Sequence, residues 1–327
     1  MTKRKLIMLL SAGGAAFLIV VAVVFGFLED NAAQKQGQMV FAETFDKGTQ
    51  IDTVKITTAQ GIITLNQKDS FWFVKERGNY YADFATLQKL LMSLNQSVYA
   101  VQLPLTDEIL KQGYLFLPQE DDAHAGMLIQ TYIGENLVDE MIVGTADKSG
   151  NYFFARHPNE NAVWLIDGDF KLPIISEQWI LRPILSIPEN SIEQITIDGK
   201  TIAREKGLEC FEDSRGMKVD AQALMTVLKG LFADDALNKE AFEKTKTDGK
   251  TKHQIEITTF FGLKFDCTVY ETPSEMWIKI NLTTTPLPKS VVSDYIKETR
   301  FLYDEWYFSV SPSQQKILRY FISNHNG

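Results

Sequence analysis

The stretch YYADFATLQKLLMSL, residues 80–94, has the pattern of an amphipathic helix. Asp83 stands ahead of the pattern, where its carboxylate can accept hydrogen bonds from the free N–H groups of the first turn and so cap the helix. The apolar residues recur at i, i+3, i+4 and i+7, which places them on one helical face. They are Leu87, Leu90, Leu91 and Leu94. Such a stripe has to be covered by another apolar surface.

Nearly the same pattern returns 137 positions later in MKVDAQALMTVLKGL, residues 217–231. Asp220 stands where Asp83 stands in the first copy. The matching apolar positions are Leu224, Val227, Leu228 and Leu231. The segment IEQITID, residues 192–198, likewise matches IDTVKIT, residues 51–57, at an offset of 141. The offsets differ because hairpin and turn positions are shortened, which a genuine repeat tolerates, so we predict a duplicated unit.

Short segments around both helices alternate apolar and polar residues, as strands with one covered face do. Val54 and Ile56 alternate with polar neighbours before the first helix. Met276, Ile278 and Ile280 alternate late in the second copy. An antiparallel sheet with one buried face would give each helix the apolar partner that it needs. We therefore predict an α+β fold with two tandem repeats, each an antiparallel sheet covered by a helix.

The N-terminal segment LIMLLSAGGAAFLIVVAVVFGFL, residues 6–28, contains no charged residue. As a helix it would span about 35 Å, enough to cross a hydrocarbon core of about 30 Å. A cleaved signal peptide is the alternative, but its apolar region is usually shorter. Basic residues 3–5 precede the segment, and Glu29 and Asp30 follow it. This charge order predicts a transmembrane helix with the N-terminus in the cytoplasm and the rest of the chain outside.

Small residues on one face of this helix suggest a seam for a partner helix, because they allow close approach. They are Ala15, Ala22 and Gly26. The predicted divisions of the chain are residues 1–28 (cytoplasmic stub and transmembrane anchor), 29–50 (linker), 51–185 (first repeat), 186–285 (second repeat) and 286–327 (C-terminal helix and tail).

The composition is that of a globular protein, since 45% of the 327 residues are hydrophobic and 23% are charged. The formal net charge is −9, and an acidic body is repelled by nucleic acid, so we expect no nucleic-acid partner. Two cysteines are too few for a disulfide framework. We expect Cys210 and Cys267, which lie in strand-like runs, to be buried. A disulfide between neighbouring strands is the alternative.

Two loops contain residue types that also occur in ligand sites. Residues 120–124 could hold a metal, but they lack the glycine spacing of a calcium loop and are expected to be a solvated loop. The candidate ligands are Glu120, Asp121, Asp122 and His124. The run GTADKSG, residues 144–150, lacks the Gly-Lys-Ser/Thr ending of a phosphate loop, so we expect a hairpin turn.

Basic residues gather at two places. Arg156 and His157 end a strand and could bind an anion, although a position at the rim of a sheet explains them equally. A lysine-rich run is expected to be a solvated hairpin or loop, with contact to a partner as the alternative. Its members are Lys244, Lys246, Lys250 and Lys252.

No catalytic motif is present in the sequence, which has four histidines and neither Gly-x-Ser-x-Gly nor His-Glu-x-x-His. A hydrolase would have to bring together an acid and a base from distant positions. Glu76 or Glu120 could serve as the acid and His157 as the base, but the sequence favours no such pair. We therefore predict no catalytic, cofactor-binding or metal-binding residues.

The chain resembles the domain-of-unknown-function family numbered 4340, found in bacterial membrane-anchored proteins. The resemblance rests on the N-terminal apolar helix, on VKITTAQGIITLNQKDSFWFV followed by the helix after Asp83, and on MIVGTADKSGNYFFARHPNENAVWLID. WILRPILSIPENSIEQITI and EWYFSVS also fit, so most of residues 51–310 is covered. The chain has Tyr81 where the family typically has proline, and the second copy has Glu209 at the position of Trp72.

Members of that family commonly occur beside ABC-type export permeases and auxiliary proteins linked to gliding-motility transport. The resemblance therefore implies an extracytoplasmic accessory part of such a transporter, and it brings no active-site residues. We expect a single-pass protein of the bacterial inner membrane with a periplasmic body, acting as a non-enzymatic accessory or binding subunit. Its expected partners are other membrane proteins such as an ABC-type permease or auxiliary subunit. The alternative is an extracytoplasmic hydrolase with a site between the two repeats.

Overall fold

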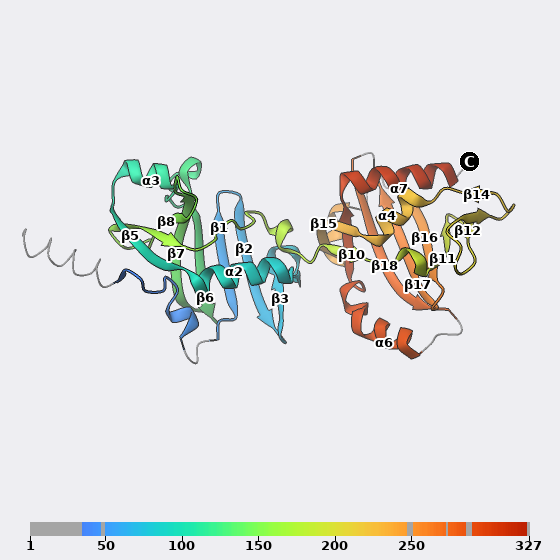
Figure 1. The fold of residues 1–327 in the computed structure, drawn as a ribbon, viewed down its shortest axis with the longest axis horizontal. Helices are drawn as coiled ribbons and strands as arrows, with labels where there is room; N and C mark the ends of the chain where they lie inside the picture. Colours follow the sequence, from blue (N-terminus) through green and yellow to red (C-terminus); the bar gives the residue numbers. More distant parts are fainter. Residues whose placement is uncertain (1–34, 47–49, 247–250, 273, 286–289, 326–327) are drawn as a thin grey trace, which may run out of the picture. The chain divides into compact units, whose positions relative to one another are not determined.

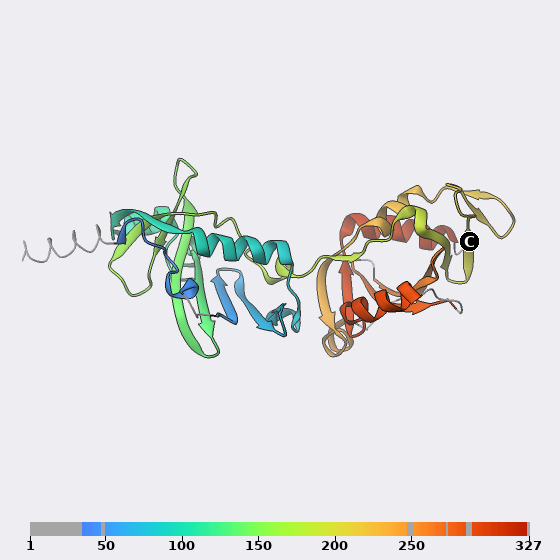
Figure 2. The same cartoon turned by 60° about the horizontal axis from the view of Figure 1, so that its bottom comes forward.

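The computed structural model describes residues 35–46, 50–246, 251–272, 274–285 and 290–325. Two antiparallel sheets and a small number of helices make the fold α+β, as predicted (Figures 1 and 2). Among the described residues, no helix has both the length and the apolar character needed to span a membrane. The predicted anchor at residues 6–28 and its seam lie outside the described residues. The seam residues are Ala15, Ala22 and Gly26.

The first sheet has nine strands in the order β4-β3-β2-β1-β6-β7-β8-β9-β5. The strands are β1 (Thr53–Thr58), β2 (Gly61–Lys68), β3 (Phe71–Val74), β4 (Tyr80–Tyr81), β5 (Val98–Pro104), β6 (Met127–Ile133), β7 (Asn136–Ala146), β8 (Tyr152–Arg156) and β9 (Ala162–Asp167). The helices that accompany them are α2 (Phe84–Gln96) and α3 (Asp107–Gly113), with the 3-10 turns η1 (Glu43–Phe45), η2 (Lys75–Arg77) and η3 (Asp122–His124).

The second sheet has ten strands in the order β10-β15-β19-β18-β17-β16-β11-β12-β13-β14. The strands are β10 (Pro183–Leu185), β11 (Ile192–Ile197), β12 (Lys200–Ala203), β13 (Phe211–Asp213), β14 (Lys218–Val219), β15 (Leu231–Asn238), β16 (Thr251–Thr259), β17 (Leu263–Glu271), β18 (Met276–Thr284) and β19 (Trp306–Val310). The remaining helices are α4 (Gln222–Lys229), α5 (Lys239–Lys246), α6 (Ser290–Thr299) and α7 (Pro312–His325), with the 3-10 turns η4 (Ser176–Trp179), η5 (Glu189–Ser191) and η6 (Arg300–Leu302).

The two sheets share one strand order. Read from β14, the second sheet runs β14-β13-β12-β11-β16-β17-β18-β19-β15, which matches the first sheet strand for strand, and β10 is the additional strand. In both sheets a helix follows the fourth strand in the chain, and that helix leads directly into an outer strand. Strand β19 is therefore the positional counterpart of β9. It pairs with β15 and β18, although the sequence analysis placed these residues in a separate C-terminal tail.

Helix α2 begins as the sequence predicts. The backbone N–H and the hydroxyl of Thr86 both donate to Asp83 Oδ2, at 2.9 and 2.7 Å. Leu87, Leu90 and Leu94 are buried, whereas Leu91 is half-buried. The helix lies along one face of the first sheet (Figure 1). Both the cap and the covering role of this helix follow from its sequence.

Helix α4 differs from α2 at both ends. Its N-cap is Ala221, and Asp220 only accepts one hydrogen bond from the Gln222 N–H at 3.1 Å. The helix ends at Gly230, so Leu231 belongs to β15 and not to the helical stripe. Leu228 and the other predicted helical stripe residues are buried, and α4 packs against α7. The predicted aspartate cap is wrong here because the helix begins two residues after the aspartate.

The chain divides into two compact units. Unit 1 holds the described residues up to Gly61 and Gln88–Leu172, and unit 2 holds Ile62–Leu87 and Pro173–Gly327. Within unit 2, Tyr80 packs on Trp306 with ring centres 4.8 Å apart. These aromatic contacts explain why Ile62–Leu87 groups with the later part of the chain, a division that the sequence pattern does not reveal.

The described part of the predicted linker is fixed to unit 1. Gly37 donates its N–H to the Tyr99 carbonyl at 2.8 Å, and Tyr99 donates back to the Gln38 carbonyl at 3.0 Å. Val40 and Phe41 are buried. Residues 37–40 therefore extend the edge of β5, and η1 contacts β7, where the Thr44 N–H donates to Asp139 Oδ2 at 2.7 Å. The described part of the linker is not a free tether.

Candidate functional site

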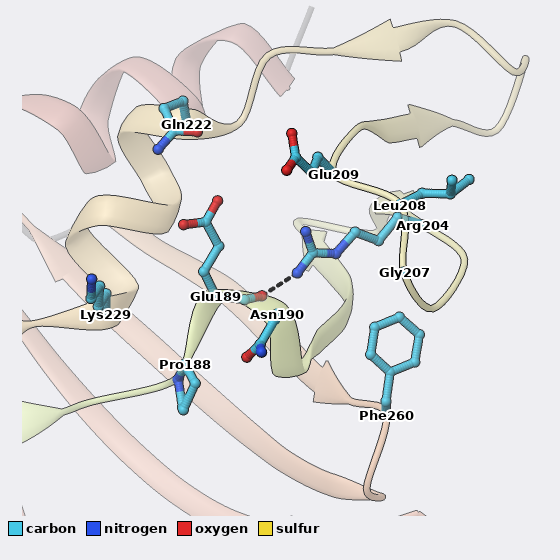
Figure 3. Close-up of a pocket in the computed structure, with 10 residues that line it drawn as sticks. All are labelled: Pro188, Glu189, Asn190, Arg204, Gly207, Leu208, Glu209, Gln222, Lys229 and Phe260. Atoms are coloured by element: carbon cyan, nitrogen blue, oxygen red, sulfur yellow. Dashed lines mark hydrogen bonds between the residues drawn. The ribbon is translucent and has the colours of Figure 1, made fainter.

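A hollow of about 700 Å³ lies in unit 2 and is lined by charged and polar side chains (Figure 3). Four parts of the chain form it: η5 with the preceding proline, the connection between β12 and β13, helix α4, and Phe260 in the turn between β16 and β17. Gln222 and Lys229, the first and last residues of α4, both line it. We call this space the polar hollow. Its size is within the usual range for small-molecule sites, about 300–1,000 Å³.

Arg204 is held rigidly in the polar hollow. Its Nε donates to the Ile192 carbonyl at 2.8 Å, and its Nη2 donates to the Glu189 carbonyl. The guanidinium carbon lies 4.6 Å from the centre of the Phe211 ring, within the range of a cation–π contact. A guanidinium fixed in this way loses little side-chain entropy when it meets a ligand.

Charges of both signs line the polar hollow. Arg204 and Lys229 contribute cations, while Glu189 and Glu209 contribute carboxylates. Among the residues that the structure describes, none of these four side chains forms an ion pair. Figure 3 shows the carboxylates of Glu189 and Glu209 and the guanidinium arranged around one space. The arrangement suits a ligand that carries both a positive and a negative group, because each ligand charge finds a partner of opposite sign.

The sequence did not single out these residues, which are spread from Pro188 to Phe260. One signal was available. Glu209 stands at the position of Trp72 at the 137-residue offset of the two helices, so a charged residue replaces an aromatic one beside the hollow.

The acidic segment predicted as a solvated loop forms η3 and its flanking turns. Asp121 Oδ2 lies 2.8 Å from His124 Nδ1, and this hydrogen bond lowers the pKa of the Asp121 carboxyl below its usual range. Glu120 accepts the Leu117 N–H at 3.0 Å. Within the described ranges, no group of three or more potential ligands could hold a metal ion. These side chains stabilise their own loop.

The segment predicted as a hairpin turn joins β7 to β8. Asp147 accepts hydrogen bonds from the Ser149 hydroxyl at 2.8 Å and from the Tyr152 N–H at 3.2 Å. Gly144 has a structural role, because a Cβ added there would lie 1.7 Å from the Gly113 carbonyl oxygen. The glycine permits two backbone segments to approach closely.

Arg156 and His157 are engaged within unit 1. Arg156 Nε donates to the Leu115 carbonyl at 2.8 Å, and burial lowers the pKa of its guanidinium. His157 Nδ1 lies 2.8 Å from the Glu140 carbonyl, which can only accept, so this nitrogen carries the proton. The Nε2 atom lies 2.6 Å from the Tyr99 hydroxyl, and burial raises the pKa of Tyr99.

The acids considered for hydrolysis also have separate structural partners. Glu76 accepts the Thr64 N–H at 2.8 Å, and Glu120 lies 3.5 Å from the Arg156 guanidinium in addition to its backbone contact. Glu76, Glu120 and His157 each therefore stabilise the structure around them.

Both cysteines are free. Cys267 is buried as predicted, and burial raises its pKa to about 12. Cys210 is exposed, so the prediction that it is buried is wrong. It lies in the connection that lines the polar hollow, because β13 begins only at Phe211, three residues after the start of the strand-like run LECFED.

The lysine-rich run also differs from the expected loop. Lys244 and Lys246 belong to α5, and Lys252 belongs to β16, where its ammonium lies 5.3 Å from the centre of the Tyr270 ring. Lys250 lies outside the described residues.

A family described as "Domain of unknown function (DUF4340)" matches residues 72–253. The match covers more than half of the chain, so the chain belongs to this family and the resemblance seen in the sequence is confirmed. It includes all four charged residues of the polar hollow. No curated protein and no solved structure matches the chain.

Proposed function

We propose that this DUF4340 protein is a membrane-anchored, extracytoplasmic accessory subunit that binds a polar ligand or partner group in the polar hollow and does not catalyse a reaction. The observation that carries the proposal is the set of four charged side chains, two of each sign, that line one space of about 700 Å³ and form no ion pair among the described residues. Charges that line one space and lack an ionic partner gain one when a complementary ligand binds.

The anchor and the cellular location belong to the same proposal. The uncharged segment at residues 6–28 and the basic residues before it support a single-pass helix in the bacterial inner membrane. The body would then be periplasmic. The expected partners are membrane proteins such as an ABC-type permease or an auxiliary subunit, in contact through the seam at Ala15, Ala22 and Gly26.

We also propose that the two sheets are tandem copies of one unit. Their common strand order, with a helix after the fourth strand, supports a duplication in which one scaffold was retained and only the second copy acquired the polar hollow. On this proposal the first copy has a structural role, and ligand binding belongs to the second.

The proposal is tested by purifying the full chain from its own membranes under mild detergent conditions and identifying the proteins that accompany it. We expect a permease or auxiliary subunit in the wild-type sample, and its loss in a variant with Lys229→Ala and Glu209→Ala. The matched control carries Glu108→Ala and Lys111→Ala, an exposed pair of the same charges on α3. Recovery of the chain alone under every condition would reject the accessory role.

The location is tested with protease added to spheroplasts. An extracytoplasmic body is digested while the membrane is intact. Digestion that begins only after the membrane is broken would reject the proposed orientation.

A further inference from the structure

A second hollow lies next to the polar hollow in unit 2, with a volume of about 320 Å³. Its lining is mainly apolar and includes Ile187, Leu263 and Phe265 from the sheet side and Val292 from α6. We call it the apolar hollow. Phe261 and Tyr295 also line it and are 49% and 42% exposed, so the hollow is open to solvent on that side.

The two hollows share a single wall. Pro188 borders both, and the next residues alternate, since Asn190 lines the polar hollow and Ser191 the apolar hollow. The turn between β16 and β17 alternates in the same way, with Phe260 on the polar side and Phe261 on the apolar side. The Phe260 N–H donates to the Ser191 carbonyl at 2.9 Å and joins the two parts of the wall. The two hollows therefore adjoin at Pro188, with charged groups lining one and mainly apolar groups lining the other.

We infer that the two hollows form one site for a zwitterionic amphiphile, with the charged head group in the polar hollow and an acyl chain in the apolar hollow. The inference rests on the proposed function, because it names the chemical class of the ligand of the polar hollow. The paired charges of opposite sign match a head group that contains both a phosphate and an ammonium group. Transfer of the methylene groups of an acyl chain from water to the apolar hollow favours binding.

The exposed apolar rim favours an amphiphile from a membrane over a soluble polar molecule. Leu208 beside the polar hollow is 56% exposed, and Phe261 and Tyr295 stand beside the apolar hollow. Exposed apolar and aromatic groups around a site are common where a protein meets a lipid surface. The acidic composition of the chain disfavours an anionic head group of the same size.

The test uses the full chain in its native membrane and a lysophosphatidylethanolamine with a photoreactive diazirine at the end of its acyl chain. After irradiation, peptide mass spectrometry locates the labelled residues. We expect labelling in the segments that contain Phe261–Phe265 and Val292–Tyr295. The substitution Ser186→Phe, at an exposed position on the lining, fills the apolar hollow and should reduce this labelling about tenfold.

Substitutions on the polar side separate the contribution of the head group. Lys229→Ala with Glu209→Gln should weaken labelling by the zwitterionic probe about tenfold and leave a probe with the same chain and a carboxylate head less affected. Phe84→Ala, an exposed aromatic residue outside both hollows, is the matched control and should leave labelling unchanged.

Labelling that is spread over the surface, or that is the same in all variants, would overturn the inference. So would displacement of the probe by a partner-protein peptide and not by unlabelled lysolipid, since the hollows would then be a peptide site. Loss of labelling with partner recovery intact rejects the amphiphile site alone. Loss of partner recovery with labelling intact rejects the accessory role and leaves the amphiphile site standing.

Discussion

The third and fourth strands of the two sheets occupy equivalent places in one strand order, yet their side chains differ sharply. In the first sheet, Phe71 and Phe73 both pack on Tyr81, with ring centres 5.7 and 5.0 Å apart. At the same offset as the two helices, the second sheet has Leu208 and Cys210. Those positions precede β13 as an irregular connection, and Glu209 between them lines the polar hollow.

The polar hollow thus lies where Leu208 and Cys210 replace the aromatic residues Phe71 and Phe73 of the first sheet. Cross-strand aromatic pairs hold neighbouring strands together and fill the space between side chains. In the second sheet a connection that contains Gly207, with a φ of +95°, stands in place of these aromatic pairs. Gly207 and Arg204 both line the polar hollow. Four predictions test this comparison, beginning with the largest expected effect.

The first prediction concerns the stability of the first sheet. Gly144→Ala should destabilise unit 1 by about 3 kcal/mol or more, because the added Cβ meets the Gly113 carbonyl oxygen and both backbones have to move. Hydrogen exchange should show loss of protection in β7 and β8 and retained protection in β16 to β18. The control Gly150→Ala meets open space at a φ of +76° and should cost only about 1 kcal/mol. Equal loss of protection in both sheets would show that they unfold together.

The second prediction compares the two covering helices. Leu87→Ala in α2 and Leu224→Ala in α4 remove buried leucines at matching positions of the two helices, and each should lower the free energy of unfolding by about 3 kcal/mol. The measurement is urea denaturation of both variants against wild type. A cost near zero for either variant would contradict the equivalence of the helices.

The third prediction exchanges a residue between the sheets. Glu209→Trp places the residue of the first sheet into the second and should reduce ligand binding in the polar hollow about tenfold, because a charge is lost and the space is partly filled. Thermal denaturation should show little change, since Glu209 is exposed. Trp72→Glu in the first sheet is the reciprocal variant and should leave binding unaltered. Unchanged binding in Glu209→Trp would separate this residue from the site.

The fourth prediction compares the two aspartates. Asp83→Ala removes an N-cap that accepts two hydrogen bonds and should cost about 1 kcal/mol, whereas Asp220→Ala removes one weaker contact outside the helix and should cost a few tenths of that. Urea denaturation of both variants beside the wild type shows which substitution lowers the free energy of unfolding more. A larger cost at Asp220 would mean that α4 begins earlier than the hydrogen bonds indicate.

Much of the scaffold could be predicted because its signals are local. The stripe at Leu87, Leu90 and Leu94 identified a covering helix, and Asp83 identified its first turn. Helical periodicity and capping depend on residues within a few positions of each other, so one sequence contains the full signal. The prediction failed at Asp220, where the same residue type lies two positions from the helix start and the local rule has no means of choosing.

The candidate site could not be predicted in the same way. Glu189, Arg204, Glu209 and Lys229 follow no periodic spacing, and each is an ordinary charged residue when considered alone. Their common environment depends on the path of a connection and on the placement of a helix. Both are long-range properties, and the only trace that they left in the sequence is the substitution of an aromatic residue by Glu209.

Residue patterns were enough to predict the α+β class, the covering helices, the family and a duplication. The pairing of distant segments is visible only in the folded chain, where β19 completes the second sheet after a long intervening segment and residues 37–40 join the edge of β5. The tertiary structure also decided that four charged side chains surround one space. The physical reason is that helix and strand patterns reflect which residues avoid water, whereas strand neighbours and hollows depend on which distant backbones pair and how closely they pack.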